Sequence, residues 1–270
     1  MKRLGLIAIH GMGKTEDTFA DAFFADVRSR LSPVQSESLI TQKVFYQNIL
    51  QTNQENYFAR VRQDIDWKKL RQFMLYGICD AASLESQKIG EQSPYFIAQT
   101  RILEAFRAVY RELEGNNRRV IVAAQSLGGQ VLSNYLWDAS RTEKPAHGVW
   151  SSPPAFETEE EEAFCRGKSI VRLNTTGCNI PIFVAGRDPE EIKPIPRPNG
   201  SFEWHNYYDE DDVLGWPLRA LSSSYAQLVT ADHQINSGGM ASFFNPLSHT
   251  GYWEDKDFLR PLAEQIRQHL

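Results

Sequence analysis

The apolar and polar positions of this chain predict strands and amphipathic helices in alternation. Residues 4–9 are a short uncharged run of the kind that forms a buried strand. Residues 19–31 follow with apolar side chains on one helical face, and a second strand is expected at residues 43–46. A strand, a helix and a strand in this order indicate the opening of a parallel α/β sheet.

The rest of the chain continues this pattern. Residues 102–113 have helical apolar spacing and are followed by Gly-Asn-Asn, a typical end of a helix. Residues 120–124 are a second buried-strand run, after which helical spacing returns. Further strands are expected at residues 170–173, 180–185 and 204–208, and a last helix at residues 258–266.

Residues 52–97 interrupt the alternation with a helical segment rich in aromatic side chains, among them Tyr57, Trp67 and Tyr76. One interpretation is a cap, inserted into a single domain of residues 1–270, that lies over an edge of the sheet. The other is a packed helical excursion with no role in binding. The sequence leaves both open.

Composition narrows the class of protein. A chain of 270 residues, 41% hydrophobic and 23% charged, is long enough to bury a full core and is typical of an ordinary globular domain. Its net charge of −5 argues against a nucleic acid or an anionic membrane surface as partner, since both select clustered positive charge. The sequence carries no signal of oligomeric state.

Cysteine usage and hydropathy narrow the class of protein further. Cys79, Cys165 and Cys178 are odd in number and widely spaced, which disfavours a disulfide framework or a structural zinc site. No run of about 18 apolar residues predicts a membrane span. Residues 4–9 are too short for the core of a signal peptide, so a cytoplasmic location is expected.

The strongest chemical signal is the sequence Ala-Gln-Ser-Leu-Gly-Gly at residues 124–129. A serine hydroxyl is a poor nucleophile unless it is presented openly to a base. A sharp strand-to-helix turn does this, with small residues two positions before and after the serine. Ala124 and Gly128 fill those positions, although glycine is more usual at the first. Ser126 is therefore the candidate nucleophile, and a plain N-cap serine is the alternative.

A second glycine-containing turn, His10-Gly11-Met12-Gly13, follows the first predicted strand. Its glycines let the backbone fold so that the Met12 N–H faces the same point as the Leu127 N–H, where both would stabilise an oxyanion. His10 would then hold this loop through hydrogen bonds.

The same residues also fit a relaxed phosphate-binding loop, in which Gly13-Lys14-Thr15 would contact a nucleotide. Such a site needs an acidic residue at the end of another apolar strand to hold magnesium. The best-formed strand, at residues 120–124, ends instead in Gln125 and Ser126.

A catalytic base is expected last in chain order, on a loop. His249, just before the final helix, has that placement, and His233 is the second choice. For the acid that orients the histidine, Asp211 is the first choice, because Asp211, Val213 and Pro217 resemble an Asp-x-Val step that many lipase-like α/β-hydrolases carry at this point. Asp212 and Asp188 remain as alternatives.

Taken together, the loop at residues 10–13, the turn at Ser126, an aspartate near residue 211 and His249 resemble the α/β-hydrolase superfamily, in its lipase- and esterase-like branch. The resemblance implies a mostly parallel sheet flanked by helices on both faces. Because the first strand begins at residue 4, a reduced sheet of about six strands is expected.

The resemblance further implies a carboxylesterase- or lipase-like hydrolase that cleaves a small-molecule ester or thioester through an acyl-enzyme, with no metal or cofactor. It does not distinguish substrates, since one fold hosts many reactions. A nucleotide-binding protein and a non-catalytic binding protein of the same fold are the rival hypotheses.

Overall fold

A computed structural model of the chain describes residues 1–86, 90–115, 117–141, 147–237, 249 and 251–270. Its centre is a sheet of six parallel strands in the order β2-β1-β3-β4-β5-β6. The strands are β1 (Leu4–Ile9), β2 (Leu39–Val44), β3 (Arg119–Gln125), β4 (Ile170–Thr176), β5 (Glu203–Tyr208) and β6 (Val229–Gln234). The expected α/β fold, with about six parallel strands and flanking helices, is confirmed.

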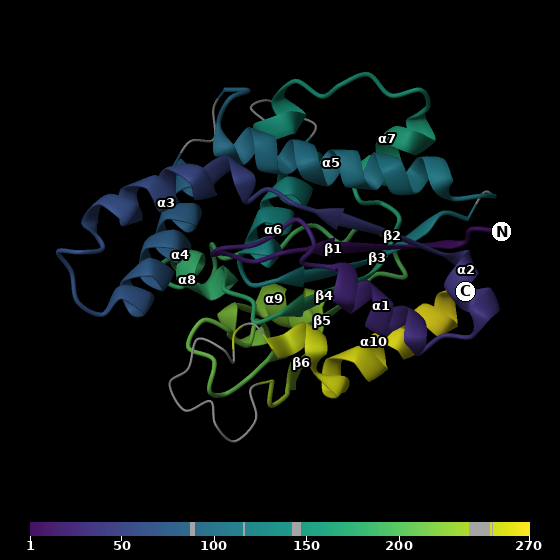
Figure 1. The fold of residues 1–270 in the computed structure, drawn as a ribbon. Coiled ribbons are helices and arrows are strands. Elements are labelled where there is room, and N and C mark those ends of the chain that lie inside the picture. Colours follow the sequence, from purple (N-terminus) through teal and green to yellow (C-terminus); the bar gives the residue numbers. More distant parts are fainter. Residues whose placement is uncertain (87–89, 116, 142–146, 238–248, 250) are drawn as a thin grey trace.

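Helices pack on both faces of this sheet (Figure 1). The helices in the described part of the chain are α1 (Asp21–Ser29), α2 (Pro33–Ser38), α3 (Asn48–Val61), α4 (Lys68–Ser86), α5 (Pro94–Glu112), α6 (Leu127–Ser140), α7 (Glu159–Cys165), α8 (Ile180–Val184), α9 (Ser223–Leu228) and α10 (Lys256–His269). Short 3₁₀ turns lie at Gly148–Ser151, Arg219–Leu221 and Gly251–Glu254.

Strand β1 shows how the core divides between the two faces. All six of its residues are buried, and successive side chains point to opposite sides. Ile7 and Ile9 pack with residues of α5 and α6, whereas Leu4, Leu6 and Ala8 pack with residues of α1 and α10. A strand covered on both faces needs a continuous apolar sequence, which is why this run is readable in the sequence.

Most of the predicted elements are confirmed, with two differences. The strand expected at residues 43–46 is β2, which lies a few residues earlier, at Leu39–Val44. The strand expected at residues 180–185 is wrong, because this segment forms the short helix α8. Pro181 lacks a backbone N–H, which the first turn of a helix tolerates, and a short apolar run fits either a strand or a buried helix.

The segment at residues 52–97 contains most of α3, all of α4 and the first turn of α5. Figure 1 shows α3 and α4 beyond the ends of the strands at which β1 and β3 finish. In an open parallel sheet this carboxyl edge is where ligands bind. The two helices therefore lie next to the edge at which a site is expected.

Among the described residues, no helix is both long enough and apolar enough to cross a membrane.

Candidate active site

Ser126 lies at the sharp turn between β3 and α6. Its φ angle is +51°, a conformation that non-glycine residues rarely adopt and that the nucleophile of a strand–turn–helix elbow is known for. Gly128 makes the turn possible, since a Cβ at this position would lie 2.5 Å from the carbonyl oxygen of His10. Gly11 has the same role opposite, where a Cβ would come within 2.7 Å of Ser126 Cβ. The two glycine-containing turns predicted from the sequence are thus packed against each other.

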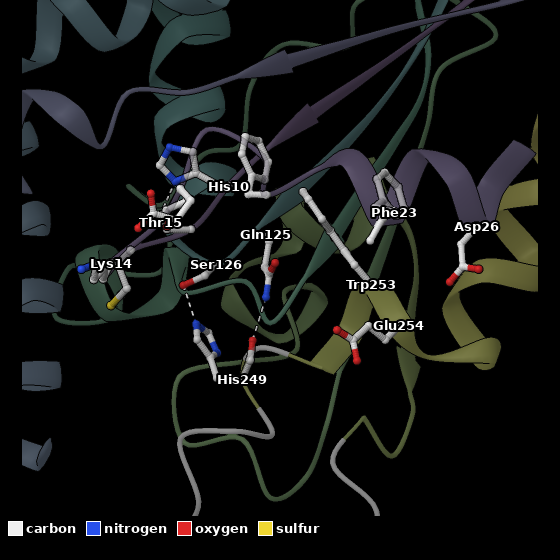
Figure 2. A pocket seen from close by; sticks show the side chains of 15 residues that line it. His10, Lys14, Thr15, Phe23, Asp26, Gln125, Ser126, His249, Trp253 and Glu254 are labelled. Atoms are coloured by element: carbon white, nitrogen blue, oxygen red, sulfur yellow. Dashed lines mark hydrogen bonds between the residues drawn. The ribbon is translucent and has the colours of Figure 1, made fainter.

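His249 lies between Ser126 and Asp212. Its Nε2 is 2.6 Å from Ser126 Oγ (Figure 2). Its Nδ1 is 2.8 Å from Asp212 Oδ2. Since Nδ1 faces a carboxylate, it carries the ring proton and donates a hydrogen bond to Asp212. Nε2 is then free to accept the hydrogen bond of the Ser126 hydroxyl, which is the arrangement a general base requires.

Three residues from separate parts of the fold support this geometry. The Gln125 amide donates to the backbone carbonyl of His249 at 2.8 Å (Figure 2). The Leu214 N–H donates to Asp212 Oδ1 at 3.0 Å and the Tyr252 hydroxyl to Asp212 Oδ2 at 2.9 Å. Each end of the histidine is therefore held by a separate element of the fold.

The surroundings of Asp212 keep it ionised. Burial by itself would raise the pKa of this carboxyl, but the contacts with His249, the Leu214 N–H and the Tyr252 hydroxyl together hold it below the ordinary value. The same negative charge, added to burial, raises the pKa of Tyr252. Tyr252 thus stays a hydroxyl donor and Asp212 a carboxylate.

The first choice of acid, Asp211, is not the residue that the structure brings to His249. Asp211 is half-buried one position earlier, and its N–H donates to Asp209 Oδ1 in the turn after β5. Successive residues of a turn point in different directions, so the carboxylate that reaches His249 is that of Asp212, the second choice. Asp188 is exposed and accepts from the Glu190 N–H in a turn.

His233, the alternative base, lies on β6 away from this cluster. Its ring stacks on Tyr207, and its Nε2 is 3.0 Å from Nδ1 of His205. Burial lowers the pKa of His233, which is consistent with packing against the sheet. The structure thus places His249, and not His233, against Ser126.

His10 is buried behind the first glycine turn. Its Nε2 accepts from the Tyr46 N–H at 3.1 Å, so its Nδ1 carries the proton and donates to the Gly11 carbonyl at 2.7 Å. The Tyr46 hydroxyl donates to the His10 carbonyl, and the two rings stack. Burial lowers the pKa of His10 to about 4, so the ring is neutral. The structure therefore gives His10 the loop-holding position expected of it.

The two N–H groups expected to face an oxyanion lie on either side of Ser126. Leu127 is the first residue of α6, and the N–H groups at a helix N-terminus have no acceptor within the helix. Met12 follows Gly11, which packs on Ser126, and lines the same cavity. Within the described part of the chain, neither N–H donates to a protein group.

A buried carboxylate of α4, Asp80, holds Gly13 of the loop at residues 10–13, and this residue was not predicted from the sequence. Asp80 Oδ2 accepts from the Gly13 N–H at 3.0 Å and from Gln47 at 2.9 Å, and Oδ1 accepts from Gln54. Burial raises the pKa of Asp80 despite these three donors. The available signal was an acidic residue four positions from both Tyr76 and Leu84, on the buried face of a helix.

The geometry around Lys14 differs from that of a phosphate-binding loop. Lys14 is exposed and forms an ion pair with Glu55 of α3 at 3.1 Å. The next helix, α1, begins only at Asp21, so no helix N-terminus adjoins Thr15. The Gly13 N–H, which would face a phosphate, is already bonded to Asp80.

Ser126 and His249 line a cavity of about 290 Å³ between the loop at residues 10–13, α1 and the turn before α10 (Figure 2). Ser126 is only 1% exposed, so a substrate must reach it through this opening.

The described residues contain no cluster of three or more His, Cys, Asp or Glu side chains able to hold a metal ion. Burial raises the pKa of both Cys165 and Cys178 to about 12, as expected for packed thiols.

No family model matches the chain, and no curated protein matches it significantly. The functional argument therefore depends on the site itself.

Proposed function

We propose that this protein is a serine hydrolase of the α/β-hydrolase type, lipase- or esterase-like, that cleaves a carboxylic ester or thioester. The observation that carries the proposal is the unbroken line of hydrogen bonds from Ser126 through His249 to Asp212. The chain order serine, aspartate, histidine and the strand–turn–helix setting of the serine both support the α/β-hydrolase type.

In the proposed reaction, His249 Nε2 takes the hydroxyl proton as Ser126 Oγ bonds to the ester carbonyl carbon. The carbonyl oxygen becomes an oxyanion, which accepts hydrogen bonds from the Met12 and Leu127 N–H groups. Asp212 stabilises the imidazolium that forms. The tetrahedral intermediate expels the alcohol, which receives its proton from His249 and leaves an acyl group on Ser126.

Water completes the cycle by the same steps. His249 takes a proton from a water molecule as the water oxygen attacks the acyl carbon, and Ser126 regains its proton when the carboxylic acid leaves. Removing one oxyanion donor from such a site costs about 100- to 1000-fold in turnover. The turn at Gly11, which positions the Met12 N–H, therefore contributes to this mechanism together with the triad side chains.

Pre-steady-state hydrolysis of p-nitrophenyl acetate tests the proposal. We expect a burst of p-nitrophenol close to one equivalent of enzyme, with the acetyl group recovered on the peptide that contains Ser126. Ser126→Ala should remove both the burst and the turnover, and its thermal unfolding temperature should stay close to that of the wild type. A burst whose acetyl group maps to another residue would contradict the assignment. Absence of turnover across esters and thioesters would favour a non-catalytic binding protein.

A further inference from the structure

An apolar groove lies on the other side of Met12 from the Ser126 cavity. It has a volume of about 480 Å³ and runs between α4 and α8, so we call it the α4–α8 groove. Figure 1 shows these two helices side by side at the carboxyl edge of the sheet. Its walls include Met74, Ile78, Ile182, Phe183 and Leu214. A volume of this size is typical of small-molecule pockets.

The mouth of the groove exposes large apolar side chains to solvent. Met74 is 46% exposed, Ile78 58% and Ile182 54%, although all three are of a type that folding normally buries. They come from two different helices and meet at one opening. Contiguous exposed apolar surface beside a cavity is typical of a binding site.

One buried polar side chain in the groove has no hydrogen-bond partner among the described residues. Asn179 is fully buried, and neither its amide nitrogen nor its amide oxygen is paired in that part of the chain. It is the one polar side chain among the described residues that line the groove. Buried polar groups are nearly always hydrogen-bonded, so this unpaired amide sets the groove apart from the packed core.

The groove adjoins the catalytic cluster at Met12. Met12 lines both the groove and the Ser126 cavity, and its sulfur packs against Gly77 of α4, where a Cβ would lie 2.6 Å away. Asn179 lies two residues after Gly177, where a Cβ would lie 3.2 Å from the His249 ring. An acyl chain carried by Ser126 would therefore pass the Met12 side chain to enter the groove.

The two cavities differ in chemistry. The Ser126 cavity is bordered by the charged residues Lys14, Glu16, Asp26 and Glu254, which suits a polar leaving alcohol. The α4–α8 groove is lined almost entirely by apolar atoms. An ester with one polar and one apolar arm would match both.

We propose that the α4–α8 groove binds the apolar acyl chain of the ester. The inference rests on the proposed function, because it takes the ester at Ser126 as given. It assigns the substrate to carboxylic esters with extended alkyl acyl chains, and it gives the segment at residues 52–97 a role in binding them.

The test is the chain-length profile of kcat/KM for p-nitrophenyl esters from acetate to octanoate. In the wild type, kcat/KM should rise about fourfold for each CH₂ that enters the groove. Ala82→Trp, at an exposed position of α4 that lines the groove, should lower the octanoate-to-acetate ratio at least about tenfold. Lys68→Trp, exposed on α4 and outside the groove, is the matched control and should keep the wild-type profile.

A second variant, Asn179→Leu, makes the lining of the groove wholly apolar. Because the amide has no hydrogen-bond partner among the described residues, its loss should leave the unfolding temperature unchanged or higher. The octanoate-to-acetate ratio should stay at or above the wild-type value, because the groove gains apolar surface. A lower ratio in a variant of unchanged stability would contradict the assignment of the groove to the acyl chain.

Three results would overturn the inference while leaving the serine hydrolase proposal intact. One is a flat acyl profile in an enzyme that is acetylated on Ser126. Another is a dependence on alcohol length in a series of alkyl acetates, with no dependence on acyl length. The last is a dimer that Ala82→Trp dissociates, which would assign the groove to a second copy of the chain. Failure of Ser126 to react with any ester would instead overturn the proposed function.

Discussion

Replacing Asp212 with asparagine should abolish the proposed hydrolase activity by moving the proton of His249 from Nδ1 to Nε2. Asp212 Oδ1 accepts from the Leu214 N–H, so the amide oxygen of asparagine is held at that position. The amide nitrogen then faces His249 Nδ1, which must give up its proton and accept. The proton moves to Nε2, which can no longer take the proton of Ser126.

The size of this effect follows from the mechanism. When a triad aspartate is replaced in this way and the geometry is kept, kcat falls about 10⁴-fold. That loss corresponds to about 5.4 kcal/mol of transition-state stabilisation. Asp212→Asn keeps the size of the side chain and the Leu214 contact, so the fold should survive.

Asp211→Asn is the matched control, because it makes the same chemical change one residue earlier. The Asp211 N–H donates to Asp209 through the backbone, a contact that the substitution leaves in place. We expect kcat within about twofold of the wild type, since surface substitutions are usually nearly neutral.

The assay is single-turnover acylation by p-nitrophenyl acetate, with circular dichroism as a check of folding. The reasoning would be refuted by a folded Asp212→Asn protein with near wild-type kcat. An inactive Asp211→Asn protein alongside it would return the acid role to Asp211.

Three further predictions concern the supports of the site. Tyr252→Phe removes the hydroxyl donated to Asp212, and we expect kcat to fall about 10- to 100-fold in stopped-flow acylation; an unchanged kcat would show that Asp212 needs no such support. Asp80→Ala leaves the Gly13 N–H unpaired and should lower kcat more than it raises KM in steady-state assays. Asp80→Asn keeps an acceptor for this N–H and should recover most of kcat. Equal losses of kcat in the two variants would argue for a purely structural role of Asp80. Burial lowers the pKa of His10 to about 4 in the folded protein, against an ordinary value of 6.5, so the unfolded chain takes up a proton first as pH falls. The free energy of unfolding, measured in urea titrations, should therefore drop by about 3 kcal/mol between pH 6.5 and pH 4. His10→Gln should lose that part of the pH dependence.

The sequence signals that succeeded are those in which a local pattern has one structural reading. A continuous apolar run such as residues 120–124 must be covered on both faces, and the small residues around Ser126 allow one kind of turn. Strand β6 was missed for the opposite reason. It is the sixth and outermost strand, with the sequence Val-Thr-Ala-Asp-His-Gln, and only Val229 is buried.

The carboxylate that faces His249 was predicted one residue too early, because the aspartates of the turn after β5 are adjacent. Sequence spacing does not tell which of two neighbouring side chains points inward. That choice depends on the turn in which the Asp212 N–H donates to the Asp209 carbonyl, and on Tyr252, 40 residues further on. Asp80 was missed because its partner Gly13 is 67 residues away. Contacts of this range appear only once the chain is folded.

The most direct measurement of the central claim is labelling by a fluorophosphonate probe, followed by mapping of the modified peptide. The account predicts one label per chain on Ser126, lost in Ser126→Ala, strongly reduced in His249→Ala and kept in His233→Ala. A label on another residue would contradict it, as would a wild-type protein that stays unlabelled or a label lost in His233→Ala and kept in His249→Ala.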